Sequence, residues 1–243
     1  MQAVFQRVEK KYLLSENQYT DLLQAFSATM TVDCYGRHTI SNIYYDTEDF
    51  QLIRASIEKP KYKEKLRLRA YGTVEENDQV FLELKKKYDG VVYKRRIPLK
   101  LETAELYLEH GIMPEIDSQI LREIDYTLKR YHLSAKAYLS YERIAMYGKE
   151  NPNLRITFDF NIKGRNYDFD LKEGTFGEDL LEKGQVLMEV KIPGAMPVWM
   201  SRLFSELGIF PVSYSKYGNY YKKYIIGKER KKKMKKKGGK LCA

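Results

Sequence analysis

Residues 65–71 read Lys-Leu-Arg-Leu-Arg-Ala-Tyr, with a basic side chain at every second position and apolar side chains between them. Successive side chains of a β-strand point to opposite faces, so this stretch predicts a strand with one apolar and one cationic face. The same alternation recurs in segments 7–11, 82–87, 154–160 and 188–192. Together these segments predict a sheet closed around a charged interior, which would hold a polyanion and a metal.

The alternative for any one of these strands is an ordinary solvated face, which antiparallel sheets commonly have. The use of arginine favours a charged interior over a solvated face. The chain has 29 Lys but only 14 Arg, so a face that is merely solvated should use Lys. Arginine presents a rigid donor fork that suits phosphate. Like charges on neighbouring strands also repel, so an anion between them would be stabilising. Six Arg lie in the predicted strands: Arg67, Arg69, Arg95, Arg96, Arg143 and Arg155.

The length of 243 residues suits one large domain with an appendage. Residues 228–243 hold nine basic residues and one acid, whereas the rest of the chain holds 34 basic and 32 acidic residues. We therefore predict a domain over 1–227 and a disordered basic tail over 228–243. The N-terminus is too polar for a signal peptide, and Cys34 and Cys242 indicate no disulfide framework. We expect a cytoplasmic protein whose tail can contact the inner face of an anionic membrane.

Local patterns predict an α+β protein with a largely antiparallel sheet and helices that cover its apolar face. The predicted strands are 3–13, 37–46, 61–71, 79–88, 91–99, 136–147, 153–163, 166–171 and 185–192. The predicted helices are 15–28, 47–57, 102–133, 197–208 and 214–226. Ser15 and Gln18 form a capping-box pattern at the first helix. The aromatic neighbours of Lys216 indicate a helix that plugs one end of a barrel.

Carboxylates at Glu9, Glu83, Asp159 and Glu189 fall among the predicted cations, and each can serve simply as an ion-pair partner. Glu189 is the best metal candidate because its strand is otherwise apolar. One or two carboxylates together with substrate phosphates usually hold Mg²⁺, and Mn²⁺ also suits oxygen ligands. The three His residues lack zinc-site spacing, and no phosphate-binding glycine loop occurs.

Short motifs in a fixed order resemble the VTC domain, the polyphosphate polymerase branch of the triphosphate tunnel metalloenzyme (CYTH-like) superfamily. They span residues 7–224. The matching segments are Arg7-Val8-Glu9-Lys10-Lys11-Tyr12, residues 41–47 (SNIYYDT), residues 65–72 (KLRLRAYG), residues 83–86 (ELKK), residues 93–96 (YKRR), Tyr141-Glu142-Arg143, residues 155–159 (RITFD), residues 188–191 (MEVK) and Ser215-Lys216-Tyr217.

The resemblance implies an antiparallel β-barrel tunnel with helices packed outside and a C-terminal helix near one end. It implies an ATP:polyphosphate phosphotransferase that moves the γ-phosphate of ATP onto a growing polyphosphate chain with Mn²⁺ or Mg²⁺. The candidate catalytic residues are Arg67, Arg69, Lys85 and Lys216. The candidate phosphate-binding residues are Lys11, Lys65, Lys94, Arg143 and Arg155, and the candidate metal ligands are Glu189 and Glu9.

Other functions on the same fold stay open. Triphosphatase and cyclase branches begin with an ExExK strand, whereas Arg7 replaces the first Glu here, which favours the VTC branch. A triphosphatase or tri/polyphosphatase is one alternative, and a module that binds polyphosphate or an inositol phosphate without catalysis is another. A separate membrane partner would be needed for translocation. Nucleic acid is disfavoured because the lysine run has no interleaved aromatic residues.

Overall fold

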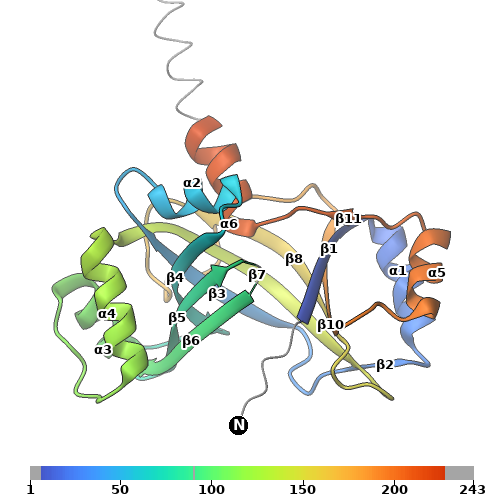
Figure 1. The fold of residues 1–243 in the computed structure, drawn as a ribbon, viewed down its shortest axis with the longest axis horizontal. Helices are drawn as coiled ribbons and strands as arrows, with labels where there is room; N and C mark the ends of the chain where they lie inside the picture. The colour runs from blue at the N-terminus through green and yellow to red at the C-terminus, as the bar shows by residue number, and fades with distance from the viewer. Residues whose placement is uncertain (1–6, 90, 228–243) are drawn as a thin grey trace, which may run out of the picture.

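A twisted antiparallel sheet of 11 strands forms the centre of the computed structural model, which describes residues 7–89 and 91–227 (Figure 1). Its order is β11-β1-β10-β8-β7-β3-β4-β5-β6, with β2 added beside β7 and β9 beside β8. The strands are β1 (Arg7–Leu14), β2 (Met30–Val32), β3 (His38–Asp46), β4 (Tyr62–Tyr71), β5 (Gln79–Tyr88), β6 (Val91–Lys100), β7 (Ser134–Gly148), β8 (Arg155–Arg165), β9 (Glu178–Asp179), β10 (Val186–Pro193) and β11 (Pro211–Val212).

The predicted α+β tunnel fold is confirmed, with one difference in how the sheet ends. Over the described residues no hydrogen-bonded ladder joins β6 to β1, so the sheet curls without closing fully. Charged side chains lie across this seam, and Lys94 of β6 is close enough to Lys191 of β10 to repel it. Glu9 of β1 supplies an attraction across the same seam toward Lys85 of β5.

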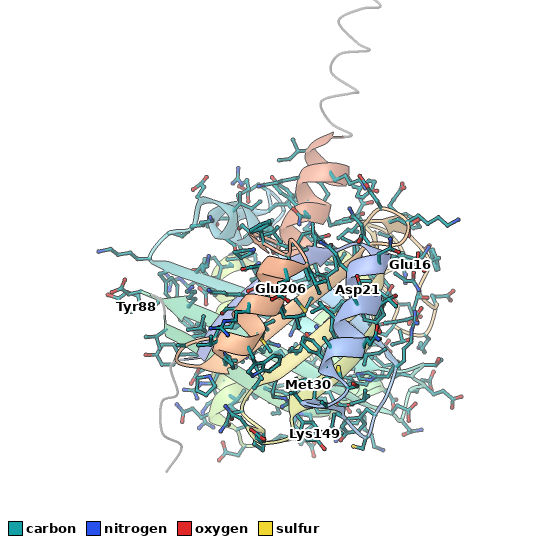
Figure 2. The ribbon with its side chains drawn as sticks, turned by 90° about the vertical axis from the view of Figure 1, so that its right-hand side faces the viewer. Glu16, Asp21, Met30, Tyr88, Lys149 and Glu206 are labelled. Carbon is teal, nitrogen blue, oxygen red and sulfur yellow. The ribbon has the colours of Figure 1, made fainter. Side chains whose placement is uncertain are left out.

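Two pairs of helices cover the outer, apolar face of the sheet (Figure 1). Helices α1 (Glu16–Phe26) and α5 (Val198–Glu206) lie side by side over β1, β10 and β8 (Figure 2). Helices α3 (Leu101–His110) and α4 (Gln119–Tyr131) pack on β4, β5 and β6. The alternating leucines of β4 and β5 supply that second contact, and Leu66, Leu82 and Leu84 are fully buried. The charged strand face is thereby turned inward.

A third helical group closes one end of the tunnel. Helix α2 (Gln51–Glu58), helix α6 (Lys216–Tyr220) and the π-helical turn Tyr221–Ile226 pack on β3, β7 and β8. Ser15 caps α1 through the predicted box with Gln18. Ser215 caps α6 by accepting a hydrogen bond from the backbone N–H of Gly218 at 3.2 Å. The predicted plug helix is therefore present at one end of the tunnel.

Two predicted elements are wrong. The single helix over 102–133 is broken into α3 and α4, because Gly111 ends α3 in the left-handed region at φ 71° and Ser118 caps α4. The predicted strand over 166–171 is a loop. Fully buried Arg165 organises this loop by donating hydrogen bonds of 2.9–3.1 Å to the carbonyls of Asp168, Asp170, Gly174 and Phe176.

The start of the predicted strand 3–13 and the predicted tail 228–243 lie outside the described residues. Within the described ranges, helices are all too short or too polar to span a bilayer.

Candidate functional site

One wall of the tunnel is built from arginines of β4 and β6 around a single carboxylate of β5. Arg67 binds Glu83 through Nε at 2.7 Å and Nη2 at 2.6 Å. Arg69 lies 3.8 Å and Arg96 lies 3.6 Å from the same carboxylate. Burial raises the pKa of Glu83, but the three guanidinium groups outweigh this, so the pKa lies below its ordinary value. Glu83 stays ionised and fixes the arginines in place.

Neutral side chains orient the same two guanidinium groups of β4. Arg69 donates from Nε to Asn42 Oδ1 at 3.0 Å and from Nη2 to the Tyr141 hydroxyl at 3.3 Å. Arg67 donates from Nη1 to the Tyr44 hydroxyl at 3.1 Å. These contacts follow from the register, which sets Asn42 opposite Arg69 and Tyr44 opposite Arg67. Both arginines are therefore held before any ligand arrives.

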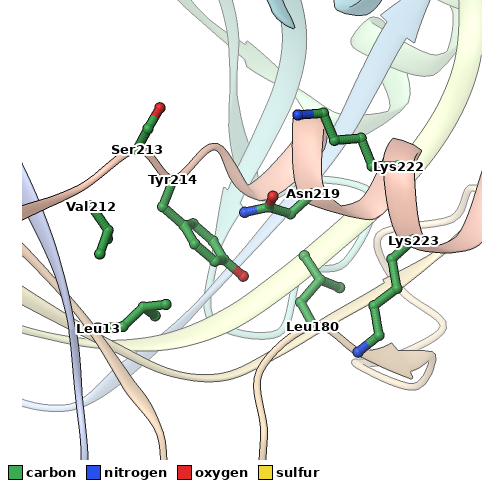
Figure 3. Close-up of a pocket in the computed structure, with 8 residues that line it drawn as sticks. All are labelled: Leu13, Leu180, Val212, Ser213, Tyr214, Asn219, Lys222 and Lys223. Atoms are coloured by element: carbon green, nitrogen blue, oxygen red, sulfur yellow. The ribbon is translucent and has the colours of Figure 1, made fainter.

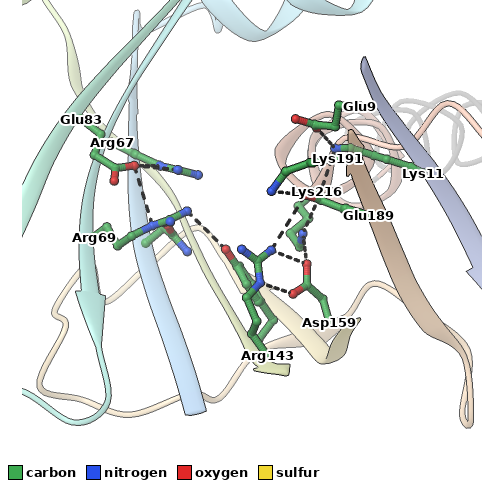
Figure 4. A network of polar contacts seen from close by, with 12 residues as sticks. Glu9, Lys11, Arg67, Arg69, Glu83, Arg143, Asp159, Glu189, Lys191 and Lys216 are labelled. Carbon is green, nitrogen blue, oxygen red and sulfur yellow. Dashed lines mark hydrogen bonds and ion pairs between the residues drawn. The ribbon is translucent and has the colours of Figure 1, made fainter. Parts of the chain in front are cut away.

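The facing wall centres on Asp159 of β8, which is fully buried (Figure 4). Arg143 of β7 donates to both its oxygens, at 2.6 and 2.8 Å. Lys216 at the start of α6 lies 2.5 Å from Asp159 and 3.3 Å from Glu189. Burial alone would lower the pKa of Lys216, but these two carboxylates raise it above its ordinary value. The plug helix thus carries a permanent cation into the tunnel.

Glu189 of β10 lies among four cations. Its oxygens are 3.3 Å from Lys11, 3.3 Å from Lys216, 3.5 Å from Lys191 and 4.0 Å from Arg143. Burial raises its pKa, but the cations, led by Lys216, hold the pKa well below the ordinary value. Glu189 is therefore an ionised carboxylate at the middle of this wall, shared by more positive charges than it can neutralise.

Three lysines of the tunnel face have no carboxylate within ion-pair distance among the described residues: Lys65, Lys85 and Lys94. Lys65 and Lys85 are directly opposed in the β4–β5 register, and Lys85 is opposed to Lys94. Lys65 donates to Ser215 Oγ at 3.2 Å. Burial, with Lys85 and Lys11 nearby, lowers the pKa of Lys65 to about 7. Loss of hydration, partly opposed by Glu9, lowers the pKa of Lys85 to about 8.

The tunnel therefore holds an uncompensated positive charge. Within the described residues, the charged network on its inner face consists of ten basic side chains and four carboxylates. The basic residues are Lys11, Lys65, Arg67, Arg69, Lys85, Lys94, Arg96, Arg143, Lys191 and Lys216, and the carboxylates are Glu9, Glu83, Asp159 and Glu189. An excess of cations at this density in a partly desolvated space favours a ligand with several negative charges.

The donor set around Glu189 fits a divalent ion only together with substrate oxygens. In the described part of the chain, no three His, Cys, Asp or Glu side chains converge as a metal cluster. One or two carboxylates plus phosphate oxygens suffice for Mg²⁺. The Thr157 hydroxyl, opposite Glu189 in the β8–β10 register, is buried, has no hydrogen-bond partner among the described residues, and offers a further oxygen. Glu9 is linked to Glu189 through Lys11, whose Nζ lies 3.6 Å from Glu9 and 3.3 Å from Glu189.

The structure brings most of the predicted site residues together. Lys11, Arg67, Arg69, Lys85, Arg143, Lys216, Glu9 and Glu189 all face the tunnel. Lys94 is exposed at the seam. Arg155 lies on the same face, opposite Lys191, but is exposed at the strand end and makes no ion pair within the described residues. The predicted set omitted Lys191, Tyr44 and Tyr141, although Lys191 keeps the period of two with Glu189.

A separate cavity of about 470 Å³ lies beside α6, outside the charged network (Figure 3). Leu13, Val212, Tyr214, Lys222 and Lys223 are among its lining residues. None of the predicted site residues lines it.

Comparison with known proteins agrees with this geometry. The model of the VTC domain family matches residues 6–225. Vacuolar transporter chaperone complex subunit 4 of Schizosaccharomyces pombe is 24% identical over an alignment of 212 residues, which covers 69% of this chain and 29% of that protein. The chain thus spans less than a third of the length of this curated relative.

Two solved structures share the fold. A candidate adenylate cyclase of Bacillus halodurans superposes with a TM-score of 0.54 and 17% identity, covering 90% of this chain and 96% of the other. A candidate adenylyl cyclase of Hippeastrum, described as having a dominant triphosphatase activity, gives 0.53 and 18%, with 89% and 95% covered. At these identities the likeness concerns the fold alone. Because the family model matches nearly the whole described structure, the chain belongs to the VTC domain family.

Proposed function

We propose that this domain is an ATP-dependent polyphosphate polymerase, which transfers the γ-phosphate of ATP to the end of an inorganic polyphosphate chain inside the tunnel. The excess of basic side chains over carboxylates on the tunnel face is the observation that carries the proposal. Membership of the VTC family and the similarity to a vacuolar transporter chaperone subunit support a polyphosphate substrate.

Phosphoryl transfer depends on in-line positioning and on neutralising charge on the phosphate oxygens, with little covalent work for the protein. Arg67 and Arg69 are oriented by Glu83, Tyr44 and Asn42 before binding, so their donors need little reorganisation. On the opposite wall, Arg143 and Lys216 supply fixed positive charge. The attacking group is a terminal phosphate oxygen of the chain, so no side-chain nucleophile is required.

Lys65, Lys85, Lys94, Lys11 and Arg155 complete the proposed site as phosphate-binding residues. The three lysines without carboxylate partners gain most from an anion, because binding relieves their mutual repulsion. Glu189, with the Thr157 hydroxyl and Glu9 close by, would hold Mn²⁺ or Mg²⁺ together with phosphate oxygens. When bound, the metal neutralises charge on the transferring phosphoryl group.

The test is incubation of the full 243-residue protein with ATP and Mn²⁺ or Mg²⁺, with products separated on a polyacrylamide gel stained for polyphosphate. We expect a metal-dependent ladder. Arg67→Ala removes a preorganised donor and should cost about 2 kcal/mol or more of transition-state stabilisation, roughly a 30-fold loss of rate. Glu189→Gln should abolish the response to metal.

Arg122→Ala is the matched control, since Arg122 is an exposed arginine on α4 that pairs with Asp117 away from the tunnel. It should retain the wild-type ladder. Near-normal turnover in Arg67→Ala refutes the assignment. Release of free phosphate without a ladder identifies a triphosphatase on the same fold instead. Polyphosphate binding without turnover identifies a binding module.

The bounds of the domain, the basic segment that follows it and the partners of the chain belong to the same proposal. Residues 1–227 form the catalytic domain, and the basic segment 228–243 contacts an anionic membrane face or polyphosphate. The relative is a subunit of a complex, so we propose a protein partner for this chain as well, with inositol phosphate as a further ligand of the assembly.

A further inference from the structure

The cavity beside α6 combines two cations with several neutral hydrogen-bond donors (Figure 3). Its volume of about 470 Å³ lies within the range of roughly 300–1,000 Å³ that is usual for small-molecule sites. The polar residues of its lining are Ser213, Tyr214, Asn219, Lys222 and Lys223. Among the described residues no Asp or Glu lines it, so the cavity presents positive charge without a carboxylate to balance that charge.

Both lysines of the cavity keep their positive charge uncompensated. Lys223 donates to the backbone carbonyl of Asp179 at 3.0 Å, which is a neutral acceptor and leaves further N–H donors of the ammonium group unused. The carboxylate of Asp179 pairs instead with Lys163 at 3.2 Å. Lys222 is exposed and makes no ion pair within the described residues. An anion in the cavity would therefore be the counter-charge that these two lysines lack.

A tyrosine hydroxyl in the same place also lacks a partner. Figure 3 shows the Tyr214 ring extending toward the space between Leu13, Leu180 and Asn219. Its hydroxyl oxygen is buried and has no hydrogen-bond partner among the described residues. Because an unpaired buried polar atom is costly, a ligand that accepts the hydroxyl proton would be stabilising. The cavity therefore has an unused neutral donor beside its two cations.

The helical segment that carries both lysines has an unusual backbone. Tyr221–Ile226 is a π-helical turn that directly follows α6, and it contains Lys222 and Lys223. Such turns are rare and occur frequently at functional sites. Asn219 lines the cavity from α6, so the change from α-helix to π-helix takes place at the cavity wall. This backbone feature points to a ligand site independently of the charges.

We propose that this cavity is an anion-binding site separate from the tunnel, and that it takes a phosphate-class oxyanion such as orthophosphate or pyrophosphate. Ammonium groups and hydroxyl or amide donors without a carboxylate among them favour an oxyanion and disfavour a cation. The anion is either free in solution or the end of a polyphosphate chain. The proposal does not depend on the proposed function, because none of the tunnel cations lines the cavity.

The position of the cavity connects such a site to the catalytic residues. Lys216 begins α6, and the same continuous helical segment lines the cavity through Asn219, Lys222 and Lys223. On the other side the cavity is lined by Leu13 of β1 and Val212 of β11. A bound anion would therefore join the plug helix to the edge of the sheet.

The test is equilibrium dialysis of the full 243-residue protein against radiolabelled inorganic pyrophosphate. Salt at about 0.15 M screens weak contacts with exposed lysines. Wild type should bind two ions per chain, one in the tunnel and one in the cavity. Lys222→Gln/Lys223→Gln should lose the cavity site, and Arg67→Ala/Arg69→Ala should lose the tunnel site. Tyr214→Phe should weaken the cavity site about tenfold, because one hydrogen bond to a charged group is lost.

Lys129→Gln/Lys149→Gln is the matched control, since it also removes two exposed lysines and neither of them lines the cavity. Lys149 donates to the Ser27 carbonyl at 2.9 Å, as Lys223 does to the Asp179 carbonyl. This variant should bind pyrophosphate as wild type does. Segment 228–243 is the same in every variant, so any binding by its basic residues cancels in the comparison.

Two ions retained in Lys222→Gln/Lys223→Gln overturn the proposal, as does loss of all binding in Arg67→Ala/Arg69→Ala. A single wild-type ion that only the arginine variant loses overturns it while leaving the proposed function intact. A single ion that only the lysine variant loses upholds it and refutes the phosphate-binding tunnel. Repeating the dialysis with long-chain polyphosphate present distinguishes the two sources. Continued binding at the cavity identifies the free anion, and displacement by the chain identifies the chain as the ligand.

Discussion

The Tyr217 hydroxyl donates a hydrogen bond of 3.1 Å to the buried carboxylate of Asp46, joining the plug helix to the end of β3. Asp46 also accepts from the backbone N–H groups of Leu52 and Ile53 in α2. The Tyr217 ring stacks on Tyr44 at 4.7 Å, and Tyr44 in turn accepts from Arg67. Tyr217 directly follows Lys216 in the sequence, so its bond to Asp46 holds Lys216 in place. Through the stacked Tyr44 ring it also holds Arg67.

Tyr217→Phe tests this coupling. The variant keeps the ring and loses one hydrogen bond, so the free energy of unfolding should fall by only about 1 kcal/mol. Turnover should fall roughly tenfold, because a shift of the plug moves Lys216 relative to the phosphates. Steady-state kinetics and thermal unfolding measure the two effects. Tyr224→Phe removes a hydroxyl that bonds to the Asp179 carbonyl outside the tunnel and should leave turnover unchanged. Equal rates in the two variants contradict the coupling.

Lys216 and Asp159 form a buried ion pair whose halves depend on each other. Lys216→Met takes away a cation that pairs with the buried negative charge of Asp159 and should lower the free energy of unfolding by about 3 kcal/mol. Asp159→Asn in the same chain removes part of that charge, so the double variant should be less destabilised than the sum of the single variants. Chemical denaturation of the four proteins gives the coupling energy. A value near zero would show that the pair contributes little.

Polyphosphate binding should depend on pH through Lys65 and Lys85. Their pKa values of about 7 and about 8 in the free protein lie below that of an ordinary lysine. Both lysines lose charge as the pH rises through this range, so affinity should fall between pH 7 and 9. At pH 7.5 a bound polyanion should draw protons onto them. Titration calorimetry in buffers of different ionisation enthalpy measures this uptake, and a buffer-independent heat contradicts it.

The same lysines should affect the stability of the empty protein. Their folded-state pKa values lie below the unfolded value of about 10.4, so the unfolded chain binds more protons between about pH 7 and 10. Their contribution to the free energy of unfolding therefore rises with pH across that window. Lys65→Met should raise the melting temperature of the empty protein at pH 7 and weaken polyphosphate binding. An unchanged melting temperature would show that the repulsion is already screened.

Arg165→Lys should separate folding from function. The buried guanidinium donates to four carbonyls and stacks 3.5 Å from the centroid of Tyr138, which a lysine cannot reproduce. Unfolding free energy should fall by about 2–4 kcal/mol. The residue lies outside the charged network, so the folded variant should keep its affinity for tripolyphosphate. A selective loss of that affinity would place Arg165 in the binding site.

Local sequence patterns were sufficient for most elements and for one face of the site. Alternation in β4 and β5 places Arg67, Arg69 and Lys85 on one face because strand geometry has a fixed period. The open seam was not predictable, since it depends on strands 7–14 and 91–100, whose meeting is set by the curl of the whole sheet. The alternation of side chains also does not show how deep in the tunnel a residue lies. Arg155 therefore shares the tunnel face and yet is exposed.

Residues that act through tertiary contacts carried the weakest signals. Asp46 and Tyr217 are 171 positions apart, and nothing local to either shows that they meet. The helix predicted over 102–133 failed for a local reason, because Gly111 ends α3 in the left-handed region and Ser118 caps a new helix. Arg165 had no pattern at all, since its partners are backbone carbonyls of a loop.

Lys216 comes later in the sequence than both carboxylates that it contacts, and this order has a consequence for biosynthesis. The cations of β4 and β5 leave the ribosome early, whereas Lys216 follows Asp159 and Glu189 by 57 and 27 residues. Until that segment emerges, the two carboxylates lack the ammonium group that both contact. The nascent domain therefore gains this shared ammonium group only when α6 is made, so in a chain stalled before residue 216 Asp159 and Glu189 lack one of the cations that hold them ionised.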